Sequence, residues 1–225
     1  MANARVLIET SPIAAAVGLN LGVDKEAEHF APVRLSVEAV TLERGGHVLF
    51  ERLSFSAAGG DFVELRGPNG AGKTSLLRAI AGFLKLTTGA ITFEGVEDAQ
   101  LALHLLGHRD GLKAALNVEA HARYWASLLG EGADAGAALD RVGLARIADL
   151  PARILSQGQS RRLALTRLVT APRPVWLLDE PAAGLDTQGK DLLDALIAEH
   201  RARGGLVIAG LHERLTEEAT MTVTL

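Results

Sequence analysis

The sequence predicts an α/β fold that combines a mixed sheet, parallel in its centre with an antiparallel part, and a helical subdomain. Two segments, 174–180 (PVWLLDE) and 205–210 (GLVIAG), are nearly continuous apolar runs, as expected of parallel strands buried on both faces. Residues 35–56 instead alternate apolar and polar side chains, which is typical of half-exposed antiparallel strands. Residues from about 110 to 170 are rich in Ala and Leu at helical spacing. Strands that alternate with helices indicate parallel crossovers in one α/β core.

The first half of the chain supplies the antiparallel strands and the start of the parallel sheet. Strands at 35–42 and 47–56 flank a Gly-Gly turn. A strand at 61–67 stops at a glycine-rich loop, and 73–84 then has the spacing of a helix. Two short strands are predicted after this helix, at 90–95 and 101–107.

The second half supplies the helical subdomain and the rest of the sheet. The helical pattern is interrupted at 130–136 (GEGADAG) and at Pro151. The buried strand at 174–180 is followed by a predicted helix from about 188 to 203, which leads to the second buried strand. The last residues (MTVTL) are predicted to form one more strand.

Composition limits the class of protein to which the chain can belong. The 225 residues are 48% hydrophobic and 22% charged, which is enough to bury a sizeable core. A net charge of −4 gives no indication of a nucleic-acid-binding surface. The absence of cysteine excludes disulfides, thiolate metal sites and cysteine nucleophiles. No run of 18 apolar residues is present, so no membrane span is predicted.

We expect residues 34–225 to form one domain, with the helical subdomain at about 110–170. Residues 1–33 are interpreted as an N-terminal extension of unassigned function that ends near Pro32. Its apolar part at 11–23 (SPIAAAVGLNLGV) is short and contains Asn20, so a secretory signal is not favoured.

The stretch GPNGAGKTS at Gly67–Ser75 has the spacing G-x-x-x-x-G-K-[ST] between a strand and a helix. Its glycines let the backbone curl so that successive N–H groups point at an anion, and the helix adds its positive dipole end. Lys73 is expected to reach the β- and γ-phosphates of ATP, and Thr74 to offer its hydroxyl to Mg²⁺. The candidate nucleotide ligands are Gly67, Pro68, Asn69, Gly70, Ala71, Gly72, Lys73, Thr74 and Ser75.

Two adjacent acids end the buried strand at 174–180. Asp179 would lie beside the Mg²⁺, and Glu180 would polarise an attacking water. An apolar run that ends in Asp-Glu is weak evidence alone, because acids also favour helix N-termini. Its combination with the phosphate loop strengthens the prediction.

A second candidate anion site begins at LSQGQSRRLALTRL, residues 155–168. Ser156 and Gly158 precede a basic, Leu-patterned helix whose N-terminus could bind an anion. Two phosphate cradles on one chain make sense if two chains each offer the second cradle to the other's ATP. The alternative is that Ser156 is only a helix N-cap.

The chain resembles the ATP-binding-cassette (ABC) ATPases from about residue 35 to 215. Five ordered stretches carry the resemblance: Gly67–Ser75 resembles Walker A, Leu155–Gln159 the signature motif, Val175–Glu180 Walker B, 183–186 (AGLD) the D-loop, and His212 the switch histidine. The resemblance implies an ABC-type P-loop ATPase core, with Lys73, Glu180 and His212 in catalytic roles. It also implies a dimer in which Ser156 and Gly158 contact the γ-phosphate held by the partner's Lys73.

Three positions depart from this family pattern. Gln157 stands where glycine is usual in the signature motif, and no aromatic residue is available to stack on adenine before Phe50. Arg44 or His47 could stack on the base instead, as a guanidinium can; the alternative is weaker or less selective recognition of the base. His108 stands where the family places a glutamine that touches Mg²⁺ or water and joins the helical subdomain. A neutral imidazole there could bridge to the nucleotide through water.

A narrower resemblance connects residues 106–125 and 155–168 with the ATP-binding subunit of the cytochrome c biogenesis haem exporter, in which histidine commonly replaces that glutamine. It implies a peripheral subunit on the cytoplasmic face of the inner membrane. This subunit works with integral-membrane subunits and couples ATP hydrolysis to haem export or delivery for cytochrome c maturation. The alternatives are another ABC transporter and, less favoured, a non-transport ABC ATPase of translation or DNA repair. Neither tandem cassettes nor long coiled coils, typical of those last classes, are present.

The remaining histidines and arginines are interpreted as structural. His104 and His108 lie four residues apart on a predicted strand, about 13 Å, which is too far to share one metal ion. His121 is expected to pack or to face a partner. Arg161 and Arg162 are expected to lie on a solvated or dipole-adjacent helix face.

Overall fold

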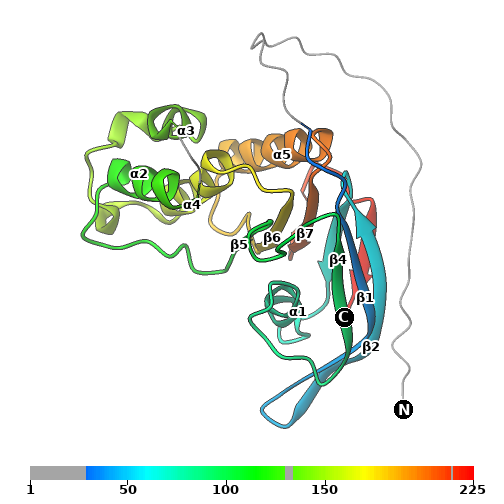
Figure 1. The fold of residues 1–225 in the computed structure, drawn as a ribbon. Helices are drawn as coiled ribbons and strands as arrows, with labels where there is room; N and C mark the ends of the chain where they lie inside the picture. Colours follow the sequence, from blue (N-terminus) through cyan, green and yellow to red (C-terminus); the bar gives the residue numbers. More distant parts are fainter. Residues whose placement is uncertain (1–28, 130–133, 214) are drawn as a thin grey trace.

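The computed structural model describes residues 29–129, 134–213 and 215–225. Most of the predicted extension at 1–33 lies outside the described residues, as does part of the predicted break at 130–136. Figure 1 shows a part built around β-strands, joined to a helical part that contains α2, α3 and α4.

The strands form two sheets. A three-stranded antiparallel sheet has the order β2-β1-β4, and a five-stranded parallel sheet has the order β5-β6-β7-β3-β8. The predicted α/β class is confirmed, and the antiparallel part is a sheet of its own. The strands are β1 (Arg34–Arg44), β2 (His47–Ala58), β3 (Phe62–Arg66), β4 (Thr88–Glu94), β5 (Leu103–Leu106), β6 (Val175–Asp179), β7 (Leu206–Gly210) and β8 (Met221–Thr224).

Five α-helices and two short 3₁₀ helices are present among the described residues. They are α1 (Lys73–Ile80), α2 (Val118–Leu129), α3 (Ala135–Arg141), η1 (Ala145–Ile147), η2 (Ala152–Ile154), α4 (Gln157–Thr170) and α5 (Thr187–Ala202). Helix α1 is shorter than the predicted 73–84, because Gly82 adopts a φ of +77° just after the last turn, as glycines that end helices do.

Side-chain alternation along the parallel strands divides the core into two layers. On one face, Trp176, Leu178 and Val207 pack with α2, α4 and α5. On the other face, Leu177 and Ile208 pack with α1 and the antiparallel sheet. All residues of β6 and β7 are buried, which explains their continuous apolar sequences.

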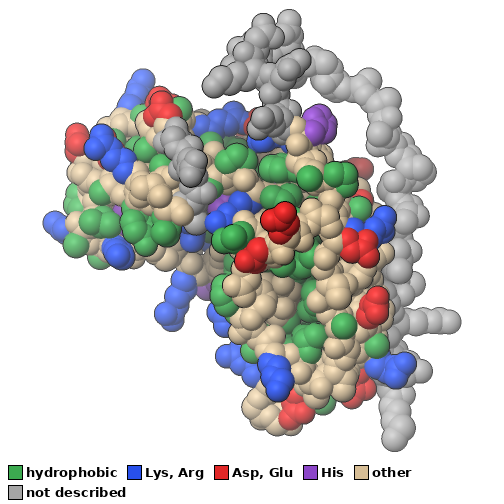
Figure 2. All heavy atoms as spheres, viewed as in Figure 1, with side chains coloured by type: hydrophobic (Ala, Val, Ile, Leu, Met, Phe, Trp, Pro, Cys, Tyr) green, Lys and Arg blue, Asp and Glu red, His purple; other side chains and the backbone are tan. Residues whose placement is uncertain are grey.

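No helix in the described ranges is long and apolar enough to cross a lipid bilayer. On the face shown in Figure 2, Lys and Arg side chains are interspersed with Asp and Glu side chains.

Candidate functional site

Four loops that follow parallel strands carry the candidate residues. The glycine-rich loop follows β3, His108 follows β5, Glu180 follows β6 and His212 follows β7. The carboxyl ends of parallel strands meet at one edge of a sheet, which is where α/β proteins bind ligands. The topology therefore gathers residues that are far apart in the sequence.

The glycine-rich loop has the curled backbone that its sequence predicts, with φ values that favour glycine. Gly67, Gly70 and Gly72 have φ values of +147°, +87° and +106°. A Cβ at Gly67 would lie 2.9 Å from the carbonyl oxygen of Leu225, and one at Gly72 would lie 3.1 Å from the Phe50 ring. No atom lies within 4 Å of the position that a Cβ on Gly70 would occupy, so the constraint at Gly70 is its φ and not a close neighbour.

The lysine and threonine that begin α1 are held by partners within the site. The ammonium of Lys73 donates to the carbonyl oxygens of Gly67 at 2.6 Å and Pro68 at 3.2 Å. The hydroxyl of Thr74 lies 3.0 and 2.9 Å from the two carboxylate oxygens of Asp179. Walker A and Walker B are thus in direct contact.

A hydroxyl beside a carboxylate suits Mg²⁺, which prefers oxygen ligands. In the part of the chain that the structure describes, no cluster of three or more His, Cys, Asp or Glu side chains could hold a metal ion alone. Mg²⁺ commonly takes one or two protein ligands and completes its shell with phosphate oxygens and water. Thr74 and Asp179 therefore fit an ion that arrives with a nucleotide.

Glu180 lies between two histidines. Its Oε1 is 2.8 Å from Nε2 of His212, and its Oε2 is 3.4 Å from Nδ1 of His108. Its φ of +50° is rare for a residue with a side chain, and its N–H donates to the carbonyl oxygen of Gly210 at 2.9 Å. The carboxylate is partly exposed and can take a proton from a water molecule. The sequence suggested roles for both histidines but not that both contact Glu180.

The start of α4 is a capping box. The Ser156 hydroxyl accepts from the N–H of Gln159 at 3.2 Å, and the Gln159 side chain accepts from the N–H of Ser156 at 2.9 Å. A Cβ on Gly158 would lie 2.9 Å from the carbonyl oxygen of Gly184, and Gln157 packs against the same glycine. The signature and D-loop stretches thus meet. Figure 1 shows the start of α4 in the helical part, apart from α1, so one chain does not unite the two phosphate cradles.

The interpretation of Arg161 as a solvated residue is wrong. Arg161 is only 2% exposed. Its N–H groups donate to the carbonyl oxygens of Gly107, Asp179, Glu180 and Pro181 and to the carboxylate of Asp110. Arg161 shares a helix face with Leu165 and Leu168, at i+4 and i+7, and this spacing could have indicated burial. Asp110 was missed because nothing in its local sequence marks it.

Arg162 is not fully solvated either. Its side chain is 19% exposed, and its guanidinium lies 3.4 Å from the carboxylate of Asp186. Its Nε is buried, with no hydrogen-bond partner in the described part of the chain.

The other singled-out residues occupy separate places. His104 is buried with its Nε2 2.6 Å from the carbonyl oxygen of Ala171, so its partner differs from that of His108. His121 is buried and packs against Trp125, with 5.5 Å between ring centroids, which confirms the packing role. Arg44 and His47 are exposed and face each other at the β1–β2 turn. Their role toward adenine stays a prediction.

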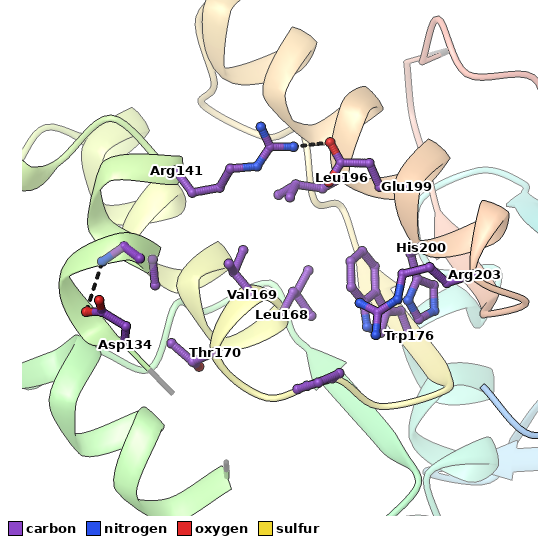
Figure 3. A pocket seen from close by; sticks show the side chains of 13 residues that line it. Asp134, Arg141, Leu168, Val169, Thr170, Trp176, Leu196, Glu199, His200 and Arg203 are labelled. Atoms are coloured by element: carbon purple, nitrogen blue, oxygen red, sulfur yellow. Dashed lines mark hydrogen bonds and ion pairs between the residues drawn. The ribbon is translucent and has the colours of Figure 1, made fainter. Parts of the chain in front are cut away.

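A cavity of about 570 Å³ lies away from these residues, between α3, α4 and α5 (Figure 3). An ion pair between Arg141 of α3 and Glu199 of α5 spans it, and the rings of Trp176 and His200 stack at 3.8 Å in its wall. None of the predicted site residues lines it.

Comparisons with known proteins show which family and which fold the chain resembles. The family model described as ABC transporter matches residues 50–183. A "Cytochrome c biogenesis ATP-binding export protein CcmA" of Rhodopseudomonas palustris is 49% identical over 80% of this chain and 92% of that protein. A protein of the same name from Bradyrhizobium diazoefficiens is 49% identical over 81% of this chain and 94% of that protein. A putative ABC transporter ATP-binding protein from Pyrococcus furiosus shares the fold, with a TM-score of 0.72 at 24% identity over 85% of this chain and 97% of that chain.

Proposed function

The chain belongs to the ABC transporter family, within the group of cytochrome c biogenesis ATP-binding export proteins, and from this premise we propose that it powers the export or delivery of haem for cytochrome c maturation. As a family member it is an ABC-type ATPase that binds nucleotide. The observation that carries the proposal is 49% identity to a relative over 92% of that relative's length. The contact between Thr74 and Asp179 beside Glu180 supports ATP as the energy source.

The proposed chemistry uses the groups at the carboxyl edge of the parallel sheet. The N–H groups of the glycine-rich loop hold the phosphates, and Lys73 exchanges its loop carbonyls for phosphate oxygens. Thr74 and Asp179 would hold Mg²⁺, and the ion would supply positive charge near those oxygens. Glu180 takes the proton of the attacking water while His212 holds its carboxylate in place.

We propose that the site is completed by a second copy of the chain. Ser156 and Gly158 begin α4, whose free N–H groups and dipole suit a phosphate. Since α4 lies apart from α1 in one chain (Figure 1), these residues would serve the ATP bound by the partner. The proposed assembly is a homodimer, with both nucleotides between the two chains.

The dimer would dock on integral-membrane subunits of a haem exporter, at the cytoplasmic face of the inner membrane. Two features support a peripheral place: no described helix could span a bilayer, and the relatives are named as ATP-binding export proteins. No nucleic-acid partner is proposed, in keeping with the net charge of −4.

Coexpression with the candidate membrane subunits tests this proposal. We expect the chain to copurify with them from detergent-solubilised membranes and to hydrolyse ATP in that complex. A chain that stays monomeric and free of those subunits would overturn the proposal. Copurification with the membrane subunits of a different transporter would keep the ATPase role and reject haem.

A further inference from the structure

We propose that Arg161 is a positioning residue that fixes the His108 loop and the Glu180 backbone relative to α4. It thereby connects the start of α4, which would bind the partner's ATP, with the chain's own Glu180 carboxylate. The inference rests on the proposed ATPase function and deepens it. The acceptors of Arg161 are four backbone carbonyls and the Asp110 carboxylate, so it acts through other residues.

One side of the guanidinium holds the backbone around Glu180. Nη2 donates to the carbonyl oxygens of Asp179 at 2.8 Å and Glu180 at 2.7 Å, and Nε donates to that of Pro181 at 3.0 Å. Three consecutive carbonyls can converge on one cation only if the chain turns sharply between them. Glu180 makes that turn with its φ of +50°, so Arg161 holds the strained conformation that aims the carboxylate.

The other side of the guanidinium holds the loop that carries His108. Nη1 donates to the carbonyl oxygen of Gly107 at 3.0 Å and to the carboxylate of Asp110 at 2.9 Å. His108 lies between these two anchors, and its Nδ1 is 3.4 Å from the Glu180 carboxylate. One side chain therefore fixes both loops whose side chains meet at the candidate catalytic site.

Arg161 also connects these loops to α4. It lies five residues after Ser156, the N-cap of α4, and in the same helix. A shift of α4 moves the Ser156 end and the guanidinium together, because a helix moves nearly as a rigid body. Binding of the partner's ATP at the start of α4 would therefore reach Glu180 through Arg161.

The donor geometry explains why arginine is needed. A guanidinium has five N–H donors in a fixed planar fork, and here all five have acceptors. Lysine keeps the charge but has three donors on one atom, so it cannot reach both loops. Methionine keeps a long stem and has no donor.

The experiment compares Arg161→Met, Arg161→Lys and Asp110→Asn with the wild type in the full-length chain assembled with its membrane subunits. Arg167→Met is the matched control. Arg167 is also in α4 and donates to the backbone of Asp110 at 2.9 Å, but it makes no hydrogen bond to residues 179–181. Hydrolysis gives kcat and KM, a fluorescent ATP analogue gives Kd, and thermal unfolding gives Tm.

We expect Arg161→Met to lower kcat about 10- to 100-fold while KM and Kd stay within about threefold, since small misplacements of a catalytic group act mainly on the chemical step. Arg161→Lys and Asp110→Asn should fall between Arg161→Met and the wild type. Arg167→Met should lower Tm with kcat within about threefold of the wild type.

Equal losses of kcat in Arg161→Met and Arg167→Met, or parallel losses in kcat and nucleotide affinity, would overturn the proposal. If Arg161→Met does not fold, a wild-type kcat in Asp110→Asn overturns it instead. A wild-type complex that hydrolyses ATP but does not support cytochrome c maturation in cells would overturn the haem proposal. The comparison of the Arg161 variants would remain valid in that case, because it measures ATP hydrolysis alone.

Discussion

Glu180 is the residue on which the proposed hydrolysis depends most directly. It is the one acid of the site whose two oxygens each face an imidazole, and its backbone is held in a left-handed conformation. Asp179, one residue earlier, is instead buried against Thr74. These different contacts support separate proposed roles for the two adjacent carboxylates, one toward Mg²⁺ and one toward water.

Replacing Glu180 with Gln tests the role of this carboxylate. The amide keeps the size and much of the hydrogen bonding but takes up protons poorly, so we expect kcat to fall about 100-fold or more with ATP binding retained. ATP should then accumulate in a stable dimer, seen as a doubled mass in size-exclusion chromatography with light scattering. Wild-type turnover in this variant would show that Glu180 is not the general base.

His108→Ala separates coupling from binding. His108 contacts Glu180 at 3.4 Å from the loop that joins the sheet to the helical part. We expect stimulation of hydrolysis by the membrane subunits to fall more than the affinity for ATP, because no phosphate cradle includes His108. ATPase assays with and without those subunits measure the first and nucleotide titration the second. Equal losses of this stimulation and of ATP affinity would show that His108 has only a structural role.

His104 and His200 predict how stability depends on pH. Burial lowers the pKa of His104 to about 4 and that of His200 to about 3. Below about pH 6.5 the unfolded chain takes up these protons, whereas the folded chain does not until the pH is near 4 or lower. The free energy of unfolding is therefore independent of these two groups above pH 6.5 and decreases as the pH falls from 6.5 toward 4.

Each of the two histidines should lower the free energy of unfolding by about 1 kcal/mol per pH unit between pH 6 and 5. His104→Gln keeps a donor toward Ala171 and should remove one histidine's share of that slope. Urea denaturation at several pH values gives the slope. An unchanged slope in His104→Gln would contradict the account.

At the scale of elements, the start of α4 combines a structural and a proposed ligand role. The Ser156 hydroxyl caps the helix, which alone accounts for a serine there. Asp134 caps α3 in the same way, accepting from the N–H groups of Gly136 at 2.8 Å and Ala137 at 3.1 Å. Only the first cap is proposed to face a nucleotide.

The pair Ser156→Ala and Asp134→Ala separates these roles. Each should cost about 1 kcal/mol of stability, because each removes one cap. Ser156→Ala should also lower hydrolysis by the dimer while sparing ATP binding to the isolated chain, and Asp134→Ala should leave hydrolysis unchanged. Thermal unfolding, nucleotide titration and ATPase assays read out the three quantities. Equal hydrolysis by the two variants would make Ser156 a cap and nothing more.

Elements with a strong local sequence pattern could be predicted, whereas the positions of side chains held by distant parts of the chain could not. Strands β6 and β7 follow from unbroken apolar runs, and the glycine-rich loop follows from its spacing. The burial of Arg161 was missed because its acceptors come from two distant loops, 51–54 residues before it and 18–20 after it. The contact between His108 and Glu180 could not be predicted from the sequence either, because it depends on the pairing of β5 with β6, and the order of strands in the sheet is not evident from the sequence.

At the scale of the whole molecule, the parallel sheet and the helical part position different residues of the proposed site. The parallel sheet aligns four loops into one site, and α4 belongs to the helical part, apart from α1 (Figure 1). Within the described residues, a single chain thus presents one complete phosphate loop and, apart from it, the N-terminus of α4 that is proposed to face the partner's nucleotide. This separation is the structural reason to expect a dimer, which the sequence indicated through two candidate phosphate cradles on one chain and through its resemblance to the ABC ATPases.

The central claim is that ATP hydrolysis by this chain drives haem handling for cytochrome c maturation. The most direct measurement is the amount of covalently bound haem in c-type cytochromes of cells that lack their own copy of the gene. We predict that the wild-type chain restores these cytochromes and that Glu180→Gln, present at equal abundance, does not. Equal restoration by both chains, or normal cytochromes in cells without the chain, would contradict the claim.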